Sequence, residues 1–255
     1  MGERAFDVIV IGAGPAGEVL AGRVAERGLQ TAIVESRLIG GECSFSACMP
    51  SKALLRPAEL LSEAQRVPGV REVLGGGLDV QAVLARRDEV VHDLDDADQV
   101  AWLTDRGVTL IRGRGRLEGD RLVRVGDELL RARRAVVIAT GSDAALPPIP
   151  GLAAARPWTN REATTSHVVP PRLLVLGGGV VGVELAQAYA SFGTAVILIE
   201  GGPRVLAREE PFAADVICSG LRERRRAVDR RPGHPGAAAG GGRRRRRRPD
   251  ARRRP

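Results

Sequence analysis

The chain has 255 residues, enough for one large or two ordinary domains, and 44% of them are apolar, which excludes a wholly disordered protein. Aromatic residues make up only 3%, which argues against the stacking surfaces that bind single-stranded nucleic acid. The net charge of +8 is unevenly spread: residues 221–255 carry 15 arginines against three acidic residues, a net charge of +12, which leaves −4 for residues 1–220. The sequence therefore predicts a mildly acidic globular part followed by a basic tail.

Neither a targeting signal nor a membrane span is visible, because no apolar run approaches the ~20 residues that cross a bilayer. The three cysteines, Cys43, Cys48 and Cys218, are an odd number, which argues against a structural disulfide framework. We therefore expect a cytoplasmic protein without a membrane partner, in which a bond between two thiols would be catalytic or regulatory. No metal site is predicted. Lys52 is the only lysine among 39 basic residues.

The chain opens with a pattern that predicts a βαβ unit. Residues 6–11 are a continuous apolar run, as in a strand buried on both faces. Residues 15–27 have helical spacing, and residues 31–34 form a second strand-like run that Glu35 closes.

A glycine motif, G-x-G-x-x-G, joins the first strand to the helix and consists of Gly12, Gly14 and Gly17. The first glycine permits a tight turn, the second lets the backbone approach a pyrophosphate, and the third lets helix and strand pack closely. The helix N-terminus favours the phosphates, and Glu35 is placed to accept hydrogen bonds from a ribose. The unit is predicted to bind a dinucleotide.

The middle of the chain predicts helices followed by short strands. Residues 51–67 have helical spacing, and residues 79–106 are predicted as one long helix. Short strands are expected at residues 108–111, 122–125 and 135–139. The proline-rich residues 143–157 then read as a connection between two lobes.

A second βαβ unit is predicted from residue 173, with strands at 173–176 and 195–199, a helix at 180–192, and a further helix starting near residue 211. Its motif residues repeat the first set at an offset of 165: Gly177, Gly179, Gly182 and Glu200. Two fingerprints imply two dinucleotides, and electron transfer between a nicotinamide and a flavin is the usual reason. Glu200 favours NAD over NADP, because a carboxylate would repel a 2′-phosphate. The alternative is a duplicated fold that binds nothing.

Cys43 and Cys48 are five residues apart, between the two units. In a regular helix this spacing rises about 7.5 Å, beyond the ~7 Å limit for a disulfide between α-carbons. The pair can therefore close only if the segment is looped or distorted, which nearby glycines and Pro50 favour. The alternative is two small buried apolar side chains.

Several runs together resemble one family. GGECSFSACMPSK (40–52) resembles the redox-active segment of the class I pyridine nucleotide-disulfide oxidoreductases, and GAGPAG (12–17), AVVIATGS (135–142), TNREATT (159–165) and GGGVVGVELA (177–186) also fit it. The resemblance covers roughly residues 5–221. These flavoproteins include dihydrolipoamide dehydrogenase, glutathione reductase and mercuric reductase. Val180 stands where glutathione reductases carry an aromatic residue, which favours the dihydrolipoamide or mercuric side.

The resemblance implies a role for each matched residue. Cys43 would exchange with the substrate disulfide, Cys48 would face the flavin and pass electrons, and Lys52 would sit near the flavin and pair with Glu184. The residues implied to hold FAD are Gly12, Gly14, Gly17, Glu35, Lys52, Gly115, Thr140 and Gly141. Those implied for NAD are Gly177, Gly179, Gly182 and Glu200.

The resemblance stops after about residue 222. Family members continue through further domains and homodimerise, whereas residues 223–255 are rich in Arg, Gly and Pro and are expected to be a disordered, frameshifted tail. The expected organisation is an FAD-binding domain at 1–150, a partial NAD(P)-binding domain at 151–222 and this tail. The fold class is α/β with two Rossmann-like units, the second incomplete.

The function predicted from these features is an FAD- and NAD(P)-dependent oxidoreductase acting on a disulfide or dithiol substrate through a Cys43–Cys48 disulfide. Turnover by this chain is expected to be low. The alternatives are a non-catalytic remnant of such an enzyme and, less favoured, a nucleic-acid-binding protein that uses the basic tail.

Overall fold

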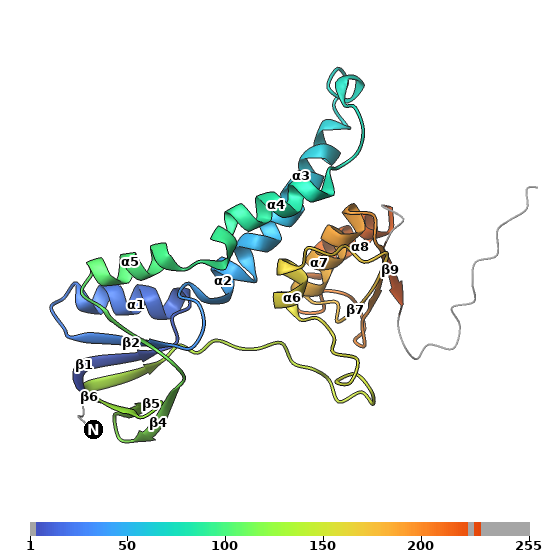
Figure 1. The fold of residues 1–255 in the computed structure, drawn as a ribbon. Coiled ribbons are helices and arrows are strands. Elements are labelled where there is room, and N and C mark those ends of the chain that lie inside the picture. The colour runs from blue at the N-terminus through green and yellow to red at the C-terminus, as the bar shows by residue number, and fades with distance from the viewer. Residues whose placement is uncertain (1–3, 224–226, 231–255) are drawn as a thin grey trace, which may run out of the picture.

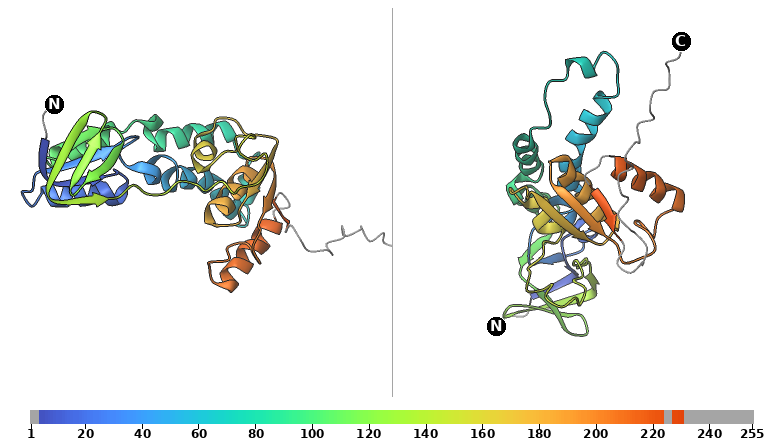
Figure 2. Two further views of the ribbon diagram at one scale, coloured as in Figure 1. Left: turned by 90° about the horizontal axis from the view of Figure 1, so that it is seen from below. Right: turned by 90° about the vertical axis from the view of Figure 1, so that its right-hand side faces the viewer.

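The computed structural model describes residues 4–223 and 227–230, which form two α/β lobes joined by a helical hairpin and by an irregular connection (Figure 1). Seen from below, the lobes lie at opposite ends of an elongated molecule, with helices between them (Figure 2). None of the helices in these residues is long and apolar enough to span a bilayer.

The first lobe is built on a six-stranded sheet in the order β3-β2-β1-β6-β5-β4. Its strands are β1 (Arg4–Ile11), β2 (Thr31–Glu35), β3 (Thr109–Arg112), β4 (Gly115–Gly119), β5 (Leu122–Val125) and β6 (Glu128–Ile138). The pairs among β3, β2, β1 and β6 are parallel, whereas β6–β5 and β5–β4 are antiparallel. The long strand β6 thus belongs both to the parallel part and to an antiparallel meander. The sequence did not predict β4.

Both faces of the central strand β1 are buried. Val8 and Val10 pack with Ala21 of α1 (Pro15–Ala25) and Leu103 of α5 (Ala97–Asp105). On the other face, side chains of β1 and β2 pack against the meander: Phe6, Ile9, Ile11, Ala32, Val34, Val123, Val125 and Leu130. The continuous apolar run is therefore confirmed as a strand covered on both sides.

Three helices lead from the first lobe toward the second: α2 (Gly41–Phe45), α3 (Cys48–Ala64) and α4 (Val80–Val90). A short 3₁₀ turn, η1 (Arg71–Val73), lies between α3 and α4. Leu54 of α3 with Val83 and Leu84 of α4 join the hydrophobic core of the second lobe. The hairpin is therefore packed into the core of the second lobe.

The prediction of one helix over residues 79–106 is wrong. The segment divides at η2 (His92–Leu94), where His92, Asp93 and Leu94 all have positive φ angles of 50° to 63°. Beyond this break, the Asp96 carboxylate accepts a hydrogen bond from the backbone of Ile39 (2.7 Å) and pairs with Arg112. The break lets α4 pack on the second lobe while α5 packs on α1, which a straight helix of this length could not do.

The second lobe has a three-stranded parallel sheet in the order β7-β8-β9. Its elements are α6 (Asn160–Thr165), β7 (Arg172–Leu176), α7 (Val180–Ser191), β8 (Ala195–Ile199), α8 (Pro211–Glu223) and β9 (Ala227–Arg230). Buried residues of α7, among them Val183, Leu185 and Tyr189, centre its core. The predicted boundary at residue 150 falls in the irregular connection at 139–159 that precedes α6.

The tail differs from the prediction at one point. Disorder is predicted for residues 223–255, but Ala227–Arg230 form β9, paired in parallel with β8. Arginines flank this short strand in the sequence, so it does not stand out as an apolar run. It can still form because strand pairing at the edge of β8 uses backbone groups and does not require apolar side chains. The rest of the predicted tail, residues 224–226 and 231–255, lies outside the described residues.

Candidate functional site

The turn after β1 is shaped by Gly12 and Gly17. Gly12 has φ +100°, and a Cβ there would overlap the carbonyl oxygen of Ala139 at the end of β6. A Cβ on Gly17 would overlap the carbonyl oxygen of Gly12 itself. Both positions therefore need glycine, the first for its backbone angle and both for close packing.

Gly14 and Glu35 complete this cradle in different ways. Gly14 is the N-cap of α1 with extended backbone angles (φ −72°, ψ 178°), and a Cβ there would meet no atom within 4 Å. The Glu35 carboxylate accepts hydrogen bonds from the backbone N–H groups of Ala13 (2.8 Å) and Arg37 (2.7 Å). Each oxygen keeps a lone pair for another donor. The cradle is thus ordered but open above Gly14.

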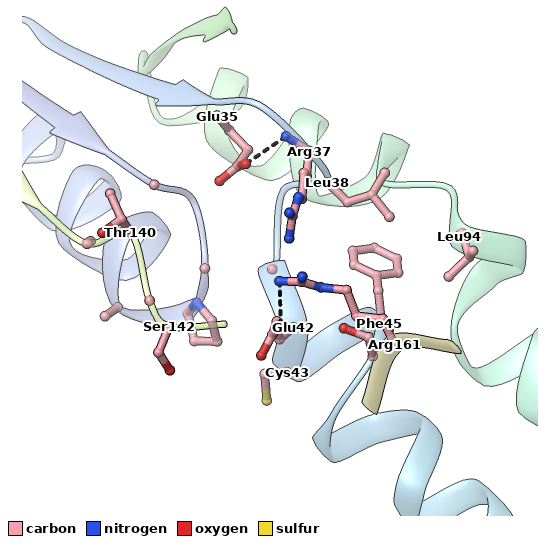
Figure 3. Close-up of a pocket in the computed structure, with 18 of the residues that line it drawn as sticks. Glu35, Arg37, Leu38, Glu42, Cys43, Phe45, Leu94, Thr140, Ser142 and Arg161 are labelled. Carbon is pink, nitrogen blue, oxygen red and sulfur yellow. Dashed lines mark hydrogen bonds and ion pairs between the residues drawn. The ribbon is translucent and has the colours of Figure 1, made fainter. Parts of the chain in front are cut away.

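A cavity of about 560 Å³ lies over this cradle and is within the usual size range of small-molecule sites (Figure 3). Thr140 and Gly141, which follow β6, form one wall of the cavity. The residues that line the cavity include Gly12, Gly14, Glu35, Arg37, Glu42, Cys43, Phe45, Thr140, Gly141 and Arg161. The glycine cradle and Cys43 therefore share one cavity.

Charged side chains that the sequence analysis did not single out gather at this cavity. Arg161 of α6 pairs with Glu42 (2.5 Å) and with Asp143 (2.7 Å), and Arg37 approaches Asp143 at 3.5 Å. The hydrogen bond and charge of Arg161 lower the pKa of the Asp143 carboxyl, with a smaller contribution from Arg37. Arg161 stands in the TNREATT run, which was the one signal that could have found it.

The two cysteines lie on either side of a break between helices. Cys43 is in α2, and Cys48 begins α3. Between them Ser46 (φ −145°, ψ 11°) and Ala47 (φ −135°, ψ −96°) are both non-helical. The distortion that a Cys43–Cys48 bond requires is therefore present, although both thiols are free in this structure.

The electrostatic setting of Cys43 combines opposing effects. A hydrogen bond with the Cys48 thiol and partial burial raise the pKa of the Cys43 thiol. The Lys52 ammonium lowers this pKa, and the Glu18 carboxylate raises it. Glu18, which no sequence motif marks, has an Oε2 that is buried without a hydrogen-bond partner among the described residues. Burial also raises the pKa of Glu18 itself.

Two predicted placements differ from the structure. Lys52 is exposed and Glu184 of α7 is half-buried, and no hydrogen bond or ion pair joins them in the part of the chain that the structure describes. The adjacent residues Ala53 and Leu54, not Lys52, form the buried side of α3. Gly115 begins β4, and a Cβ there would crowd Ile11 at 3.0 Å. It does not line the cavity, so its small size serves packing.

The second glycine unit repeats the geometry of the first. Gly177 has φ +104°, a Cβ on Gly182 would overlap the Gly177 carbonyl oxygen, and Gly179 caps α7 in extended conformation. The Glu200 carboxylate accepts hydrogen bonds from Gly178 (2.7 Å) and Gly202 (2.6 Å). The Gly202 and Gly178 N–H groups lower the pKa of Glu200. All four predicted residues are thus brought together.

Known proteins of one family are similar to this chain over most of its length. The family model described as pyridine nucleotide-disulphide oxidoreductase matches residues 6–226. Dihydrolipoyl dehydrogenase of Acholeplasma laidlawii is 34% identical over 204 residues, covering 77% of this chain and 60% of that protein. Mercuric reductase of Acidithiobacillus ferrooxidans is 33% identical over 223 residues, covering 84% and 40%.

A solved structure shows the same arrangement. The Cu(II) complex of the HOCl-induced flavoprotein disulfide reductase RclA from Escherichia coli matches with a TM-score of 0.75 and 27% identity, covering 89% of this chain and 49% of that one. The chain therefore spans about half the length of most of the relatives it matches.

Proposed function

Because the chain belongs to the pyridine nucleotide-disulphide oxidoreductase family, we propose that it carries electrons from a reduced nicotinamide nucleotide through FAD to a Cys43–Cys48 disulfide. The single observation that carries this proposal is the cavity, which has the dinucleotide cradle on one wall and Cys43 on another. A cofactor held by the cradle and reaching along the cavity would approach the Cys43 thiol directly.

The residues of the first unit fit an FAD. The open space above Gly14 at the N-terminus of α1 suits a pyrophosphate, which gains from free N–H groups and from the helix dipole. The remaining lone pairs of Glu35 can accept hydrogen bonds from a ribose, and Thr140 and Gly141 border the rest of the cavity. When bound, the flavin supplies a two-electron carrier between a hydride donor and a disulfide.

The second unit is proposed to hold the nicotinamide nucleotide. Gly179 leaves the N-terminus of α7 open, and Glu200 is fixed by two backbone hydrogen bonds. A carboxylate held in this position favours a free 2′-hydroxyl over a 2′-phosphate. NAD is therefore proposed in preference to NADP.

The overall reaction is balanced by two electrons. NADH and one proton reduce one disulfide to two thiols and leave NAD⁺. Within the chain, the sulfur–sulfur bond of Cys43 and Cys48 is cleaved, and the resulting dithiol then reduces a substrate disulfide by exchange. Following the family, Cys43 is assigned to exchange with substrate and Cys48 to the flavin side, although in this structure it is Cys43, and not Cys48, that lines the cavity. The Cys48 thiol and partial burial raise the pKa of the Cys43 thiol, and the Lys52 ammonium opposes this rise, so that its charge favours the nucleophilic thiolate.

The test uses one substitution in each unit. Gly14→Val places a branched side chain where the pyrophosphate must pass, yet its extended backbone and open surroundings should leave the fold intact. Gly179→Val makes the matched change in the second unit. After incubation with FAD and gel filtration, visible absorbance should show flavin in the wild-type and Gly179→Val proteins and none in Gly14→Val.

Equal flavin content in Gly14→Val and wild-type protein would remove FAD from this site, as would a folded wild-type protein that retains none. Turnover is measured separately, as NADH-dependent reduction of lipoamide with Cys48→Ser as the control. Reduction that survives Cys48→Ser would show that the cysteine pair is not the electron path.

A further inference from the structure

The break between Cys43 and Cys48 leaves one backbone group without its usual partner. In a continuous helix the Ser46 carbonyl would accept a hydrogen bond from the residue four positions later. That residue is Pro50, which has no N–H. Ser46 is only 8% exposed, so its carbonyl needs a partner from elsewhere in the chain.

The partner comes from α6, more than a hundred residues away. The Nδ2 of Asn160 donates to the Ser46 carbonyl at 2.9 Å. The Thr164 hydroxyl also approaches this oxygen, at 3.3 Å, but it has one hydrogen and lies closer to the Asn160 carbonyl, at 2.8 Å. The amide of Asn160 is therefore the main donor. On the other side of Cys43, Arg161 pairs with Glu42.

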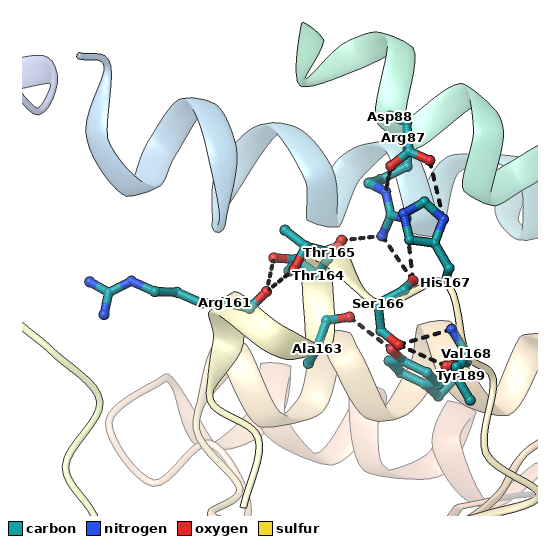
Figure 4. A network of polar contacts seen from close by, with 10 residues as sticks. All are labelled: Arg87, Asp88, Arg161, Ala163, Thr164, Thr165, Ser166, His167, Val168 and Tyr189. Atoms are coloured by element: carbon teal, nitrogen blue, oxygen red, sulfur yellow. Dashed lines mark hydrogen bonds and ion pairs between the residues drawn. The ribbon is translucent and has the colours of Figure 1, made fainter. Parts of the chain in front are cut away.

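Helix α6 is itself held at both ends and along its length, and Figure 4 shows the contacts that Arg87 and Tyr189 make with it. Thr159 and Glu162 form a capping box at its start. At its end the Arg87 guanidinium, 0% exposed, donates to the carbonyls of Thr164 and Ser166. The Tyr189 hydroxyl of α7 donates to the Ala163 carbonyl at 2.8 Å. The position of α6 is thus fixed by the second lobe and by α4.

We propose that Asn160 is a positioning residue for the redox pair: its amide replaces the N–H that Pro50 lacks and holds the break at Ser46 in the shape that a Cys43–Cys48 disulfide requires. Tyr189 of the second lobe holds α6, and α6 carries Asn160. The second lobe therefore contributes to the reduction potential of the pair. This proposal rests on the proposed function, because it concerns the same two thiols.

The physical effect is on the reduced state. With the hydrogen bond in place, the dithiol segment is already ordered, so closing the disulfide loses little further conformational entropy. Without it, the segment between the thiols gains freedom that bond formation must remove. Disulfide formation then becomes less favourable, and the pair becomes more oxidising.

The experiment measures the Cys43–Cys48 couple alone, in the full chain. The protein is equilibrated with mixtures of reduced and oxidised glutathione, in which two thiols of the protein are oxidised as one glutathione disulfide becomes two glutathione molecules. After acid quenching and alkylation, peptide mapping gives the fraction of the Cys43–Cys48 bond. Asn160→Leu removes the polar group at similar size, and Asn160→Asp keeps the shape but removes the donor.

Both Asn160 variants should lower the equilibrium constant for disulfide formation, by at most about fivefold, the factor that one ordinary hydrogen bond is worth. Thr194→Val is the matched control, because the buried Thr194 hydroxyl donates to the Pro170 carbonyl at 2.7 Å within the second lobe, away from the cysteines. It should lower stability to urea without moving this equilibrium.

The outcomes separate the two proposals. An unchanged equilibrium constant in both Asn160 variants would overturn the positioning role and leave the proposed function standing. An equal shift in Thr194→Val would also overturn it, since general loosening would then explain the result. A wild-type chain that never forms the Cys43–Cys48 bond would overturn both proposals. If Asn160→Leu fails to fold, Asn160→Asp decides the question.

Discussion

The two glycine units share their local geometry and differ in their surroundings. The turn angle is +100° at Gly12 and +104° at Gly177, and each closing carboxylate, Glu35 or Glu200, accepts two equivalent backbone hydrogen bonds. The strands leading to the turns differ. β1 lies between β2 and β6, whereas β7 is paired only with β8 among the described residues.

The difference in burial follows from this. Ile9 and Val10 of β1 are 0% exposed, while Leu174 of β7 is 55% exposed. The end of β6 crosses the turn at Gly12 and closes one wall of the cavity, whereas a Cβ at Gly177 would meet no atom of the described residues within 4 Å. A short stretch of sequence therefore suffices to form the cradle, whereas the enclosed site needs a strand from more than a hundred residues away.

The largest effect is expected from Gly12→Ala, compared with Gly177→Ala, because only the turn at Gly12 packs against the chain at the end of β6. Both variants place alanine at a strained positive φ, which costs about 1–2 kcal/mol. Only Gly12→Ala also drives a methyl group into the Ala139 carbonyl, which should add about 2 kcal/mol or more. The free energy of unfolding in urea should therefore fall clearly further in Gly12→Ala.

Each lobe carries its own tryptophan for this measurement. Trp102 is in α5 of the first lobe, and Trp158 lies 6.2 Å from Tyr189 in the second, between ring centroids. Fluorescence with the other tryptophan replaced by Phe follows each lobe in turn. Equal losses in the two variants would show that β6 adds no constraint at Gly12.

A second contrast lies four residues after the central glycine of each motif. Glu18 in the first unit corresponds to Val183 in the second, which is buried in the core. Glu18 instead has one buried oxygen without a hydrogen-bond partner among the described residues, and its charge adds a small contribution to the raised pKa of Cys43. Glu18→Gln should therefore lower this pKa and speed alkylation of Cys43 by iodoacetamide at pH 8 by about threefold.

Lys52→Gln should change the pKa of Cys43 in the opposite direction, because the Lys52 ammonium lowers this pKa. It should slow the same reaction in the reduced chain. Peptide mapping separates Cys43 from Cys48 and Cys218. If Glu18→Gln and Lys52→Gln move the alkylation rate in the same direction, the electrostatic account of this thiol is wrong.

The smallest expected effect concerns pH and the second unit. The pKa of Glu200 is lowered by the N–H groups of Gly202 and Gly178, so the folded state binds a proton there less readily than the unfolded state. Its stabilising contribution is therefore fully present above the usual value of 4.5 and is lost as the pH falls through the lowered pKa. Because the group is largely solvated, the contribution should be about 1 kcal/mol or less.

Urea unfolding of wild-type and Glu200→Gln protein at pH 7 and at pH 3 checks this. For the second lobe, the free energies of unfolding of the two proteins should differ at pH 7 and become equal at pH 3. A difference that stays constant between the two pH values would show that the Glu200 charge does not contribute.

The sequence by itself determined both glycine units. Their strands, helices and closing carboxylates follow from apolar periodicity and from steric demands within about 30 residues, and all are confirmed. The requirement for a distorted segment between Cys43 and Cys48 likewise followed from helix geometry alone. These are local constraints, and the residues that impose them are neighbours in the chain.

The tertiary structure decided what depends on distant contacts. The break at His92–Leu94 arises because α4 and α5 pack on different lobes, and β9 forms because β8 offers a free edge. Lys52 points to solvent instead of pairing with Glu184, since the buried side of α3 is set by packing on the second lobe.

The positions of the charged and polar residues around the thiols also depend on contacts between residues that are distant in the sequence. Arg161 and Asn160 reach Glu42 and Ser46 across more than a hundred residues, and the buried Arg87 holds the helix that carries them. No spacing rule in the sequence encodes such a contact, because it depends on where two lobes bring a six-residue helix. Local sterics thus fixed the cradles, and long-range packing fixed the environment in which the cysteines react.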